Sequence, residues 1–414
     1  MEKLRSKTVL MVMMDAFRHD YITKEDSPFL YKLSREGMHG SLIPSFGFEP
    51  DGAYFAGLDP EECDGGAQYW KKENERVFYF TSILNVLDRI PFPWWRKQLR
   101  HVARFSAQLL ASSEDTFISR MAPPSDIPFN KLGQFSFSMK KLACDEGFMP
   151  KPSIFDKLRD KGMRFFFHGH PAYKVRIGKV VERYLEEEHG GNALAFLFIG
   201  DLDRVGHAYG PDSSERKAML REIDSGLEKI YSHAQRNYND IDIIVFGDHG
   251  MADVKQTIDM RNIIDKLNLD NKKDTYFLDS TFARFWIADP LKKEEIINHL
   301  NSLDGGHVLT DSEKEKYRIR YPHNYFGDII YVIDDHYLIH PSFYGAGEYY
   351  PKGMHGYLPG CRDNESAFVL HGKRVIGKGD HGRIDMRKIF PTILDLLEID
   401  YGNEMPHNLK SIIK

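Results

Sequence analysis

The stretch IDIIVFGDHGM, residues 241–251, joins a continuous apolar run to an adjacent aspartate and histidine, Asp248 and His249. An unbroken apolar run of this length is typical of a strand that is buried on both faces of a parallel sheet. The carboxyl ends of such strands are where ligand sites gather in α/β proteins, and carboxylate and imidazole groups both bind divalent metal ions. We therefore expect a metal-binding strand end at this position.

Two other apolar runs end in side chains of the same kind. The run VLMVMM ends at Asp15, and the run ALAFLFIG leads into DLDRVGH, where Asp203 and His207 are one helical turn apart and can converge on one ion. A further imidazole, His355, lies in GMHGY. Three carboxylates and three imidazoles are enough ligands for two ions of the Zn²⁺ type.

Six stretches of the chain resemble, in the same order, the type I phosphodiesterase or nucleotide pyrophosphatase branch of the alkaline phosphatase superfamily. They are DAFRHDY (15–21), SPFLYKLSREGM (27–38), SIFDKLRDKGMRFFF (153–167), DLDRVGHAYGPDS (201–213), FGDHGM (246–251) and GMHGY (353–357). This resemblance covers most of the chain outside residues 65–150.

The resemblance implies two divalent metal ions, expected to be Zn²⁺ with Mn²⁺ as the alternative. One ion would be held by Asp203, His207 and His355, and the other by Asp15, Asp248 and His249. A second Asp-His-Gly sequence, residues 380–382, follows no apolar strand, so we expect it to be a loop.

The segment SLIPSFGFEPDGAYFAGLDPEE (41–62) departs from the family pattern. The family has a threonine or serine nucleophile beside its metals, whereas the alignment places Gly47 or Phe48 at that point. The nearest hydroxyl is that of Ser45, and the nearest carboxylate is that of Glu49.

Three hypotheses follow from this missing hydroxyl. Ser45 could reach the metals and act as the nucleophile, or it could be only a turn residue after Pro44. Glu49 could be a ligand or general base beside a metal-bound hydroxide, or it could only complement a helix dipole. Hydrolytic activity could also be lost while the metal site remains. We favour the hydroxide with Glu49 slightly over Ser45.

Alternating strands and helices predict an α/β fold with a mostly parallel central sheet and helices on both faces. Strands are expected near residues 9–14, 164–168, 194–200 and 241–247, and helices near 27–37, 153–161, 176–188, 213–236 and 388–398. The first of these helices should begin at Ser27 as its N-cap.

The domain prediction is one alkaline-phosphatase-like hydrolase domain over residues 1–414 with two additions. Residues 270–345 form a small α+β cap, and residues 65–150 form a helical and loop insertion that acts as a lid or a surface helix. Within this insertion, residues 90–110 predict a basic amphipathic helix, which could make peripheral contact with a membrane. We favour simple packing on the domain. The segment PPSDIPFNKLGQFSFSMKK is expected to be a loop over the active site.

The amino-acid composition limits the binding partners and the cellular location that we expect for the protein. The 56 basic and 61 acidic residues argue against coating a nucleic-acid polymer, which needs a basic surface. The three cysteines indicate no disulfide framework. The N-terminal apolar run is short and lacks a cleavage site, so it is expected to be a core strand. We expect a cytoplasmic protein, with a membrane-peripheral location as the alternative; the oligomeric state is not indicated.

These expectations define a metal-dependent hydrolase of phosphoric esters, of the phosphodiesterase or nucleotide pyrophosphatase type. Its substrate would be a phosphorylated small molecule or a lipid- or glycan-linked ester. The alternatives are a phosphomonoesterase, a sulfatase-like hydrolase or a metal-binding protein without hydrolytic activity. The stretch PSFGFEP lacks the CxPSR-like motif that sulfatases of this superfamily need.

Overall fold

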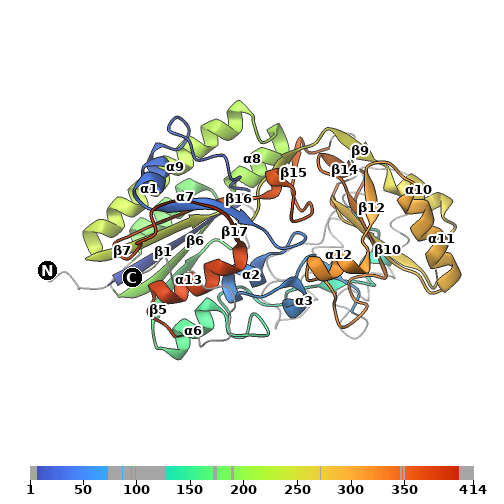
Figure 1. The fold of residues 1–414 in the computed structure, drawn as a ribbon, viewed down its shortest axis with the longest axis horizontal. Coiled ribbons are helices and arrows are strands. Elements are labelled where there is room, and N and C mark those ends of the chain that lie inside the picture. The colour runs from blue at the N-terminus through green and yellow to red at the C-terminus, as the bar shows by residue number, and fades with distance from the viewer. Residues whose placement is uncertain are drawn as a thin grey trace.

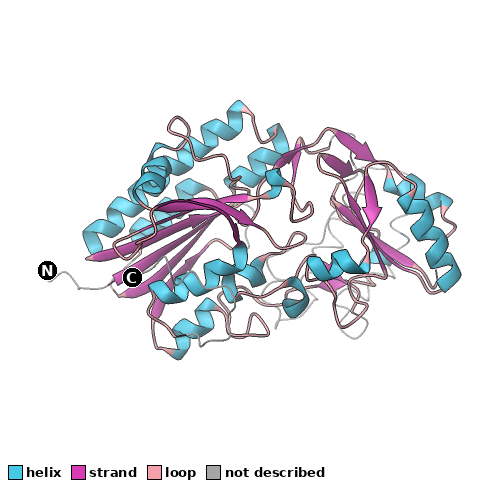
Figure 2. Ribbon diagram, viewed as in Figure 1, coloured by secondary structure: helices cyan, strands magenta, loops and turns pink. Residues whose placement is uncertain are grey.

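A computed structural model describes residues 7–72, 126–170, 175–187, 191–270, 272–345 and 350–400, together with the isolated positions 86, 95, 98 and 347. In this part of the chain the largest element is a seven-stranded sheet (Figures 1 and 2). Its strands, in spatial order, are β17 (Gly379–Asp385), β2 (Met38–Ile43), β16 (Ser366–His371), β7 (Asp240–Phe246), β1 (Lys7–Met14), β6 (Asn192–Ile199) and β5 (Arg164–His168).

The sheet is mostly parallel, as predicted. Strands β5, β6, β1 and β7 pair in parallel, β16 is antiparallel to both β7 and β2, and β17 is parallel to β2. The three apolar runs singled out in the sequence are the adjacent strands β6, β1 and β7. Met14 is opposite Ile199 and Met13 is opposite Phe246, so the carboxyl ends of these strands meet at one edge.

Helices cover both faces of this sheet (Figure 1). One face carries α1 (Pro28–Glu36), α7 (Ile177–Glu186), α8 (Asp201–Tyr209) and α9 (Ser214–Asn237). The other carries α2 (Asp51–Ala56), α6 (Ile154–Asp160) and α13 (Ile389–Leu396). Alternate residues of β1 therefore enter different cores, Leu10 and Val12 on the first face and Val9 and Met11 on the second, which explains the unbroken apolar pattern.

A second, four-stranded sheet lies at the other end of the molecule (Figure 2). Its antiparallel strands are β10 (Thr275–Leu278), β11 (Phe282–Trp286), β13 (Ile329–Ile333) and β12 (Gly306–Val308). Nearby helices are α10 (Met260–Lys266), α11 (Pro290–Asn301) and α12 (Asp311–Lys316). These elements fall mostly where the α+β cap is expected, although the division into domains stays a prediction.

Three short strand pairs complete the described sheets. They are β8 (Ala252–Asp253) with β15 (Gly353–Met354), β9 (Gln256–Ile258) with β14 (Tyr337–Ile339), and β3 (Tyr69–Trp70) with β4 (Ser136–Phe137). Phe129 in α5 (Phe129–Leu132), Phe135 and Phe137 pack in the core of the second sheet, so this stretch is more ordered than the expected loop.

The predicted helix at 90–110 lies outside the described residues, apart from isolated positions. Among the helices that the structure describes, none is long and apolar enough to cross a membrane.

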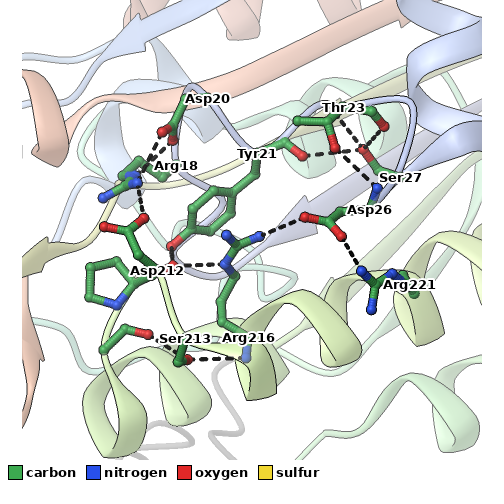
Figure 3. Close-up of polar contacts among 12 residues, drawn as sticks. Arg18, Asp20, Tyr21, Thr23, Asp26, Ser27, Asp212, Ser213, Arg216 and Arg221 are labelled. Carbon is green, nitrogen blue, oxygen red and sulfur yellow. Dashed lines mark hydrogen bonds and ion pairs between the residues drawn. The ribbon is translucent and has the colours of Figure 1, made fainter.

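One local prediction is wrong. The second Asp-His-Gly sequence is not a loop; it lies in the exposed edge strand β17, where a register shift between Asp380 and Arg383 interrupts the pairing. Ser27 is the N-cap residue of α1, as predicted, but its hydroxyl faces the carbonyls of Tyr21 and Thr23 and makes no hydrogen bond to the helix (Figure 3).

The cap of α1 comes from a distant residue. The carboxylate of Asp224, on α9, accepts hydrogen bonds from the backbone N–H groups of Phe29 and Leu30, both at 2.9 Å. A negative charge is favourable there because the N-terminus of a helix carries unpaired N–H groups and a positive partial charge. Asp224 thus joins α1 to α9, and only the fold brings the two together.

We predict that Asp224→Ala lowers the free energy of unfolding by about 1–2 kcal/mol, because two N–H groups of α1 lose their acceptor. Urea unfolding followed by circular dichroism measures this change. Glu222→Ala, which removes an exposed carboxylate from the same helix, should have little effect and serves as the control. Equal stability of the two variants would contradict the capping role.

Candidate metal centre and active site

Two groups of possible metal ligands form where the three central strands end. In each group the ligand atoms lie within 4.8 Å of one another. The first group is Asp203, His207 and His355, and the second is Asp15, Asp248 and His249. The structure therefore brings together the two sets that the family resemblance implies.

The surrounding elements explain this convergence. Asp15 directly follows β1, Asp248 and His249 follow β7, and Asp203 and His207 lie on α8, which begins immediately after β6. His355 arrives from far along the chain because β15 pairs with β8, just beyond His249. The rings of His249 and His355 stack at 3.6 Å between centroids and join the two groups.

Hydrogen bonds orient the imidazoles toward the carboxylates. Nδ1 of His207 donates to the carbonyl of Gly353, and Nδ1 of His249 donates to the carbonyl of Gly250, both at 2.8 Å. Because a carbonyl only accepts, Nε2 is the nitrogen that is free to bind a metal ion when each ring is neutral. Nε2 of His207 lies 3.0 Å from Asp203, and Nε2 of His249 lies 3.3 Å from Asp15.

The carboxylates of the second group repel one another in a buried place. Burial, followed by the charges of Asp248 and Asp203, raises the pKa of Asp15 well above its ordinary value. Burial also raises the pKa of Asp248. Each of these carboxylates is hard to ionise while the other charges are uncompensated.

In the first group, the imidazoles favour the ionised form of the carboxylate. Burial alone would raise the pKa of Asp203, but the imidazoles of His207, His355 and His249 lower it well below its ordinary value. Burial and the charge of His249 hold the pKa of His355 well below its ordinary value, which keeps this ring neutral, as a metal ligand must be. One oxygen of Asp203 is buried without a hydrogen-bond partner in the described residues.

These features fit divalent cations. The donor atoms are carboxylate oxygens and imidazole nitrogens, two imidazoles are oriented by backbone carbonyls, and the charges of Asp15 and Asp248 are incompletely compensated by the protein. Their role as ligands stays a prediction.

A cavity of about 370 Å³ opens onto both groups. Glu49 lines this cavity, and burial, together with the charges of Asp51 and Asp248, raises its pKa well above the ordinary value. Ser45 is not among the described residues that line the cavity. Two residues were proposed to make up for the missing hydroxyl, Ser45 and Glu49. Of these two, only Glu49 lines the cavity that holds the possible ligands.

Gly47, one of the two residues aligned with the family nucleophile, leaves no room for a side chain. Its φ is +91°, a left-handed conformation that a β-branched residue such as threonine strongly disfavours. A Cβ atom at this position would lie 1.8 Å from the carbonyl oxygen of Gly66. The absent hydroxyl is thus a feature of the local backbone as well as of the sequence.

The cavity also contains residues that the sequence did not identify. Asp51 accepts a hydrogen bond from the Tyr54 hydroxyl and lies 3.3 Å from Nε2 of His170. All three are buried. Asp51 and Tyr54 follow Glu49 closely in sequence, so their place near Glu49 could have been predicted. His170 follows a strand whose sequence gives no sign of a nearby site.

Apolar residues line part of the cavity. They include Leu338 and Ile339 of β14, Tyr344, Pro351, Met354 and Phe48. None of the described lining residues is a lysine or an arginine. The aromatic residues at 127–137, expected over the active site, are not among the described lining residues.

A third cluster, Asp253, His336 and Asp363, also has ligand atoms within 4.8 Å. Its carboxylates already face cations, since Lys255 lies 3.5 Å from Asp253 and Arg18 lies 3.9 Å from Asp363. We assign no ion to this cluster.

The fold and the two ligand groups define the class as an α/β protein of the alkaline phosphatase superfamily. Residues 55–358 match the family model of type I phosphodiesterase / nucleotide pyrophosphatase. The chain belongs to this family. The match contains Asp203, His207, Asp248, His249 and His355 but begins after Asp15 and Glu49.

Curated relatives match over shorter stretches. Mouse ectonucleotide pyrophosphatase/phosphodiesterase family member 7 is 28% identical over 100 residues, which cover 24% of this chain and 22% of the relative. Human family member 5 is 24% identical over 243 residues, which cover 57% of this chain and 48% of the relative. The matched stretches thus span about a fifth to a half of these relatives.

Solved structures match over nearly the whole chain. Murine ectonucleotide pyrophosphatase/phosphodiesterase 5 has a TM-score of 0.69 at 18% identity and covers 99% of this chain and 100% of its own. An inactive threonine-to-alanine variant of that murine protein, in complex with AMP, has a TM-score of 0.67, with the same identity and coverage. These likenesses confirm the fold.

We predict that the purified protein binds about two divalent cations per chain, because two groups of three ligands are present. His355→Ala should lose one of them and keep its fold, as measured by elemental analysis and circular dichroism. His381→Ala, in the second Asp-His-Gly sequence, should keep both and serves as the control. Unchanged metal content in His355→Ala would remove His355 from the ligand set.

Proposed function

We propose that this protein is a metal-dependent phosphodiester hydrolase in which water, rather than a side-chain hydroxyl, attacks phosphorus. The observation that carries this proposal is the position of Glu49, a carboxylate in the cavity beside the ligand groups, where the family nucleophile is missing. The inactive threonine-to-alanine variant of the murine relative is consistent with a hydroxyl being needed in that protein. In this chain the family pattern places Gly47 or Phe48 at the nucleophile position, and neither has a hydroxyl.

Divalent cations, when bound, neutralise charge on the phosphoryl oxygens and lower the pKa of a coordinated water. The chain's own residues then have distinct tasks. Glu49 accepts the proton of the attacking water while the bond between phosphorus and the leaving alkoxide breaks. The raised pKa makes the ionised form of Glu49 a stronger proton acceptor than an ordinary glutamate, and bound cations would favour that ionised form. In the described part of the chain, its carboxylate makes no competing hydrogen bond or ion pair.

The wall near β14 suits an apolar substituent of the diester. Leu338, Ile339 and Tyr344 offer apolar surface, and the described lining residues include no lysine or arginine for a second anionic group. We therefore propose an aryl or lipid-linked phosphodiester as the substrate class. A nucleotide is the alternative that the AMP complex of the murine relative suggests.

The nature of the ions and the location of the protein are further proposals. Mixed imidazole and carboxylate ligands suit Zn²⁺, with Mn²⁺ as the alternative. The three cysteines, all free in the structure, are consistent with the cytoplasmic location proposed from the sequence.

We predict that, with Zn²⁺ or Mn²⁺, the protein hydrolyses bis(p-nitrophenyl) phosphate faster than p-nitrophenyl phosphate. The physical reason is that a dianionic monoester finds no lysine or arginine among the described lining residues. Release of p-nitrophenolate gives kcat/KM for both esters, and Asp248→Asn tests whether the activity belongs to this site. Equal or greater activity on the monoester would favour a phosphomonoesterase. Inactivity on all esters with all metals would favour a metal-binding protein without hydrolytic activity.

We predict that Glu49→Gln lowers kcat by about 10²- to 10⁴-fold, because a general base is lost. Ser45→Ala should keep most of the activity and is the matched control. If Ser45 were the nucleophile, the two variants would behave in the reverse order.

The stereochemical course provides an independent measurement. Direct attack by water inverts a chiral phosphorus centre, whereas a covalent intermediate retains configuration through two inversions. A chiral thiophosphate diester should therefore react with inversion. Retention, together with an inactive Ser45→Ala variant, would overturn the proposal.

A further inference from the structure

One buried guanidinium touches the loops that follow all four ligand-bearing segments. Arg18 lies three residues after Asp15 and is only 6% exposed. Its Nε and Nη2 donate to the carboxylate of Asp20 at 2.7 and 2.9 Å, which fixes the plane of the guanidinium within its own loop (Figure 3).

The same guanidinium reaches three other segments. Nη2 donates to Asp212 at 2.6 Å, three residues beyond the end of α8 (Figure 3). Nη1 donates to the carbonyl of Met251 at 3.3 Å, two residues after His249. Nη1 also lies 3.9 Å from the carboxylate of Asp363, in the segment that follows His355.

These contacts add to the backbone contacts between the ligand-bearing segments. The ends of β1 and β7 are neighbours in the sheet, β15 pairs with β8 just before His355, and the N–H of Lys352 donates to the carbonyl of His207; Arg18 adds side-chain contacts that join all four segments at one point. A planar guanidinium with five donors can join several acceptors in a fixed geometry, which a lysine cannot do.

We propose that Arg18 is a positioning residue that holds the four ligand-bearing segments in the arrangement needed to bind both cations. This inference rests on the proposed ion sites, because Arg18 would act through the ligands and not by touching substrate. Such support commonly changes metal affinity, since ligands that are free to move must be ordered again when the ion binds.

The test compares two buried arginines in the same cluster. Arg216 is 5% exposed, donates to the carbonyl of Pro211 at 2.7 Å and lies 4.0 Å from the ring centroid of Tyr21. It stabilises the loop after α8, but within the described residues its guanidinium makes no hydrogen bond or ion pair with Met251 or Asp363. Arg216→Met therefore controls for loss of a buried arginine as such (Figure 3).

We predict that Arg18→Met weakens Zn²⁺ binding about 10- to 100-fold, as equilibrium dialysis of the full chain measures, while Arg216→Met keeps the wild-type dissociation constants. Both variants should have a lower melting temperature, so thermal stability alone would not separate the two roles. Arg18→Lys, which keeps the charge but loses the fork of donors, should bind Zn²⁺ with intermediate affinity.

Wild-type Zn²⁺ affinity in folded Arg18→Met would overturn the proposal, as would an equal loss of affinity in Arg216→Met. If Arg18→Met does not fold, Arg18→Lys and Asp212→Asn decide the question, because the Asp212 side chain is 72% exposed and its loss removes only one contact. Wild-type affinity in both would overturn the proposal. The dialysis result does not depend on ester hydrolysis, so failure of the proposed activity would be seen separately.

Discussion

Repulsion among Asp15, Asp203 and Asp248 is the constraint on which the site depends. Three parallel strands and one helix start bring these carboxylates to a buried edge of the large sheet, where solvent cannot screen them. Imidazoles compensate Asp203, but Asp15 and Asp248 remain difficult to ionise. Divalent cations would relieve this repulsion, so folding and ion binding are expected to be linked.

The ligand residues and the residues at the nucleophile position lie on different kinds of structure. This difference explains how this chain can keep the ligand types of the family while lacking its nucleophile. The ligands are fixed by strand ends that belong to the core of the sheet. The segment around Gly47, in contrast, is a loop between β2 and α2 whose backbone lies against Gly66. This contact excludes a side chain at residue 47, and the chain continues so that Glu49 lines the cavity.

Stability and site geometry are supported by contacts between distant parts of the chain. Asp224 caps a helix almost 200 residues earlier in the sequence, and Arg18 joins loops that follow four different elements. Both side chains are buried and polar, and their hydrogen bonds are satisfied only in the complete fold. Such groups make local segments depend on the global arrangement.

The sequence predicted four of the seven strands of the central sheet, because strands buried on both faces leave near-continuous apolar runs such as those at β1, β6 and β7; it did not predict β2, β16 or β17. It also identified all six side chains of the two ligand groups, since each lies at or near the end of a predicted element. The division of these six side chains into two ion-binding groups was predicted from the family motifs.

Only the tertiary structure decided the partners of residues whose contacts are remote in sequence. Ser27 holds the N-cap position, yet the carboxylate of Asp224 accepts the helix N–H groups because α9 packs beside α1. Only the fold shows that Glu49 and not Ser45 lines the cavity, and the role proposed for Arg18 depends on four loops meeting. Local sequence patterns record which face of an element is buried, whereas the identity of the neighbour is set by packing between elements.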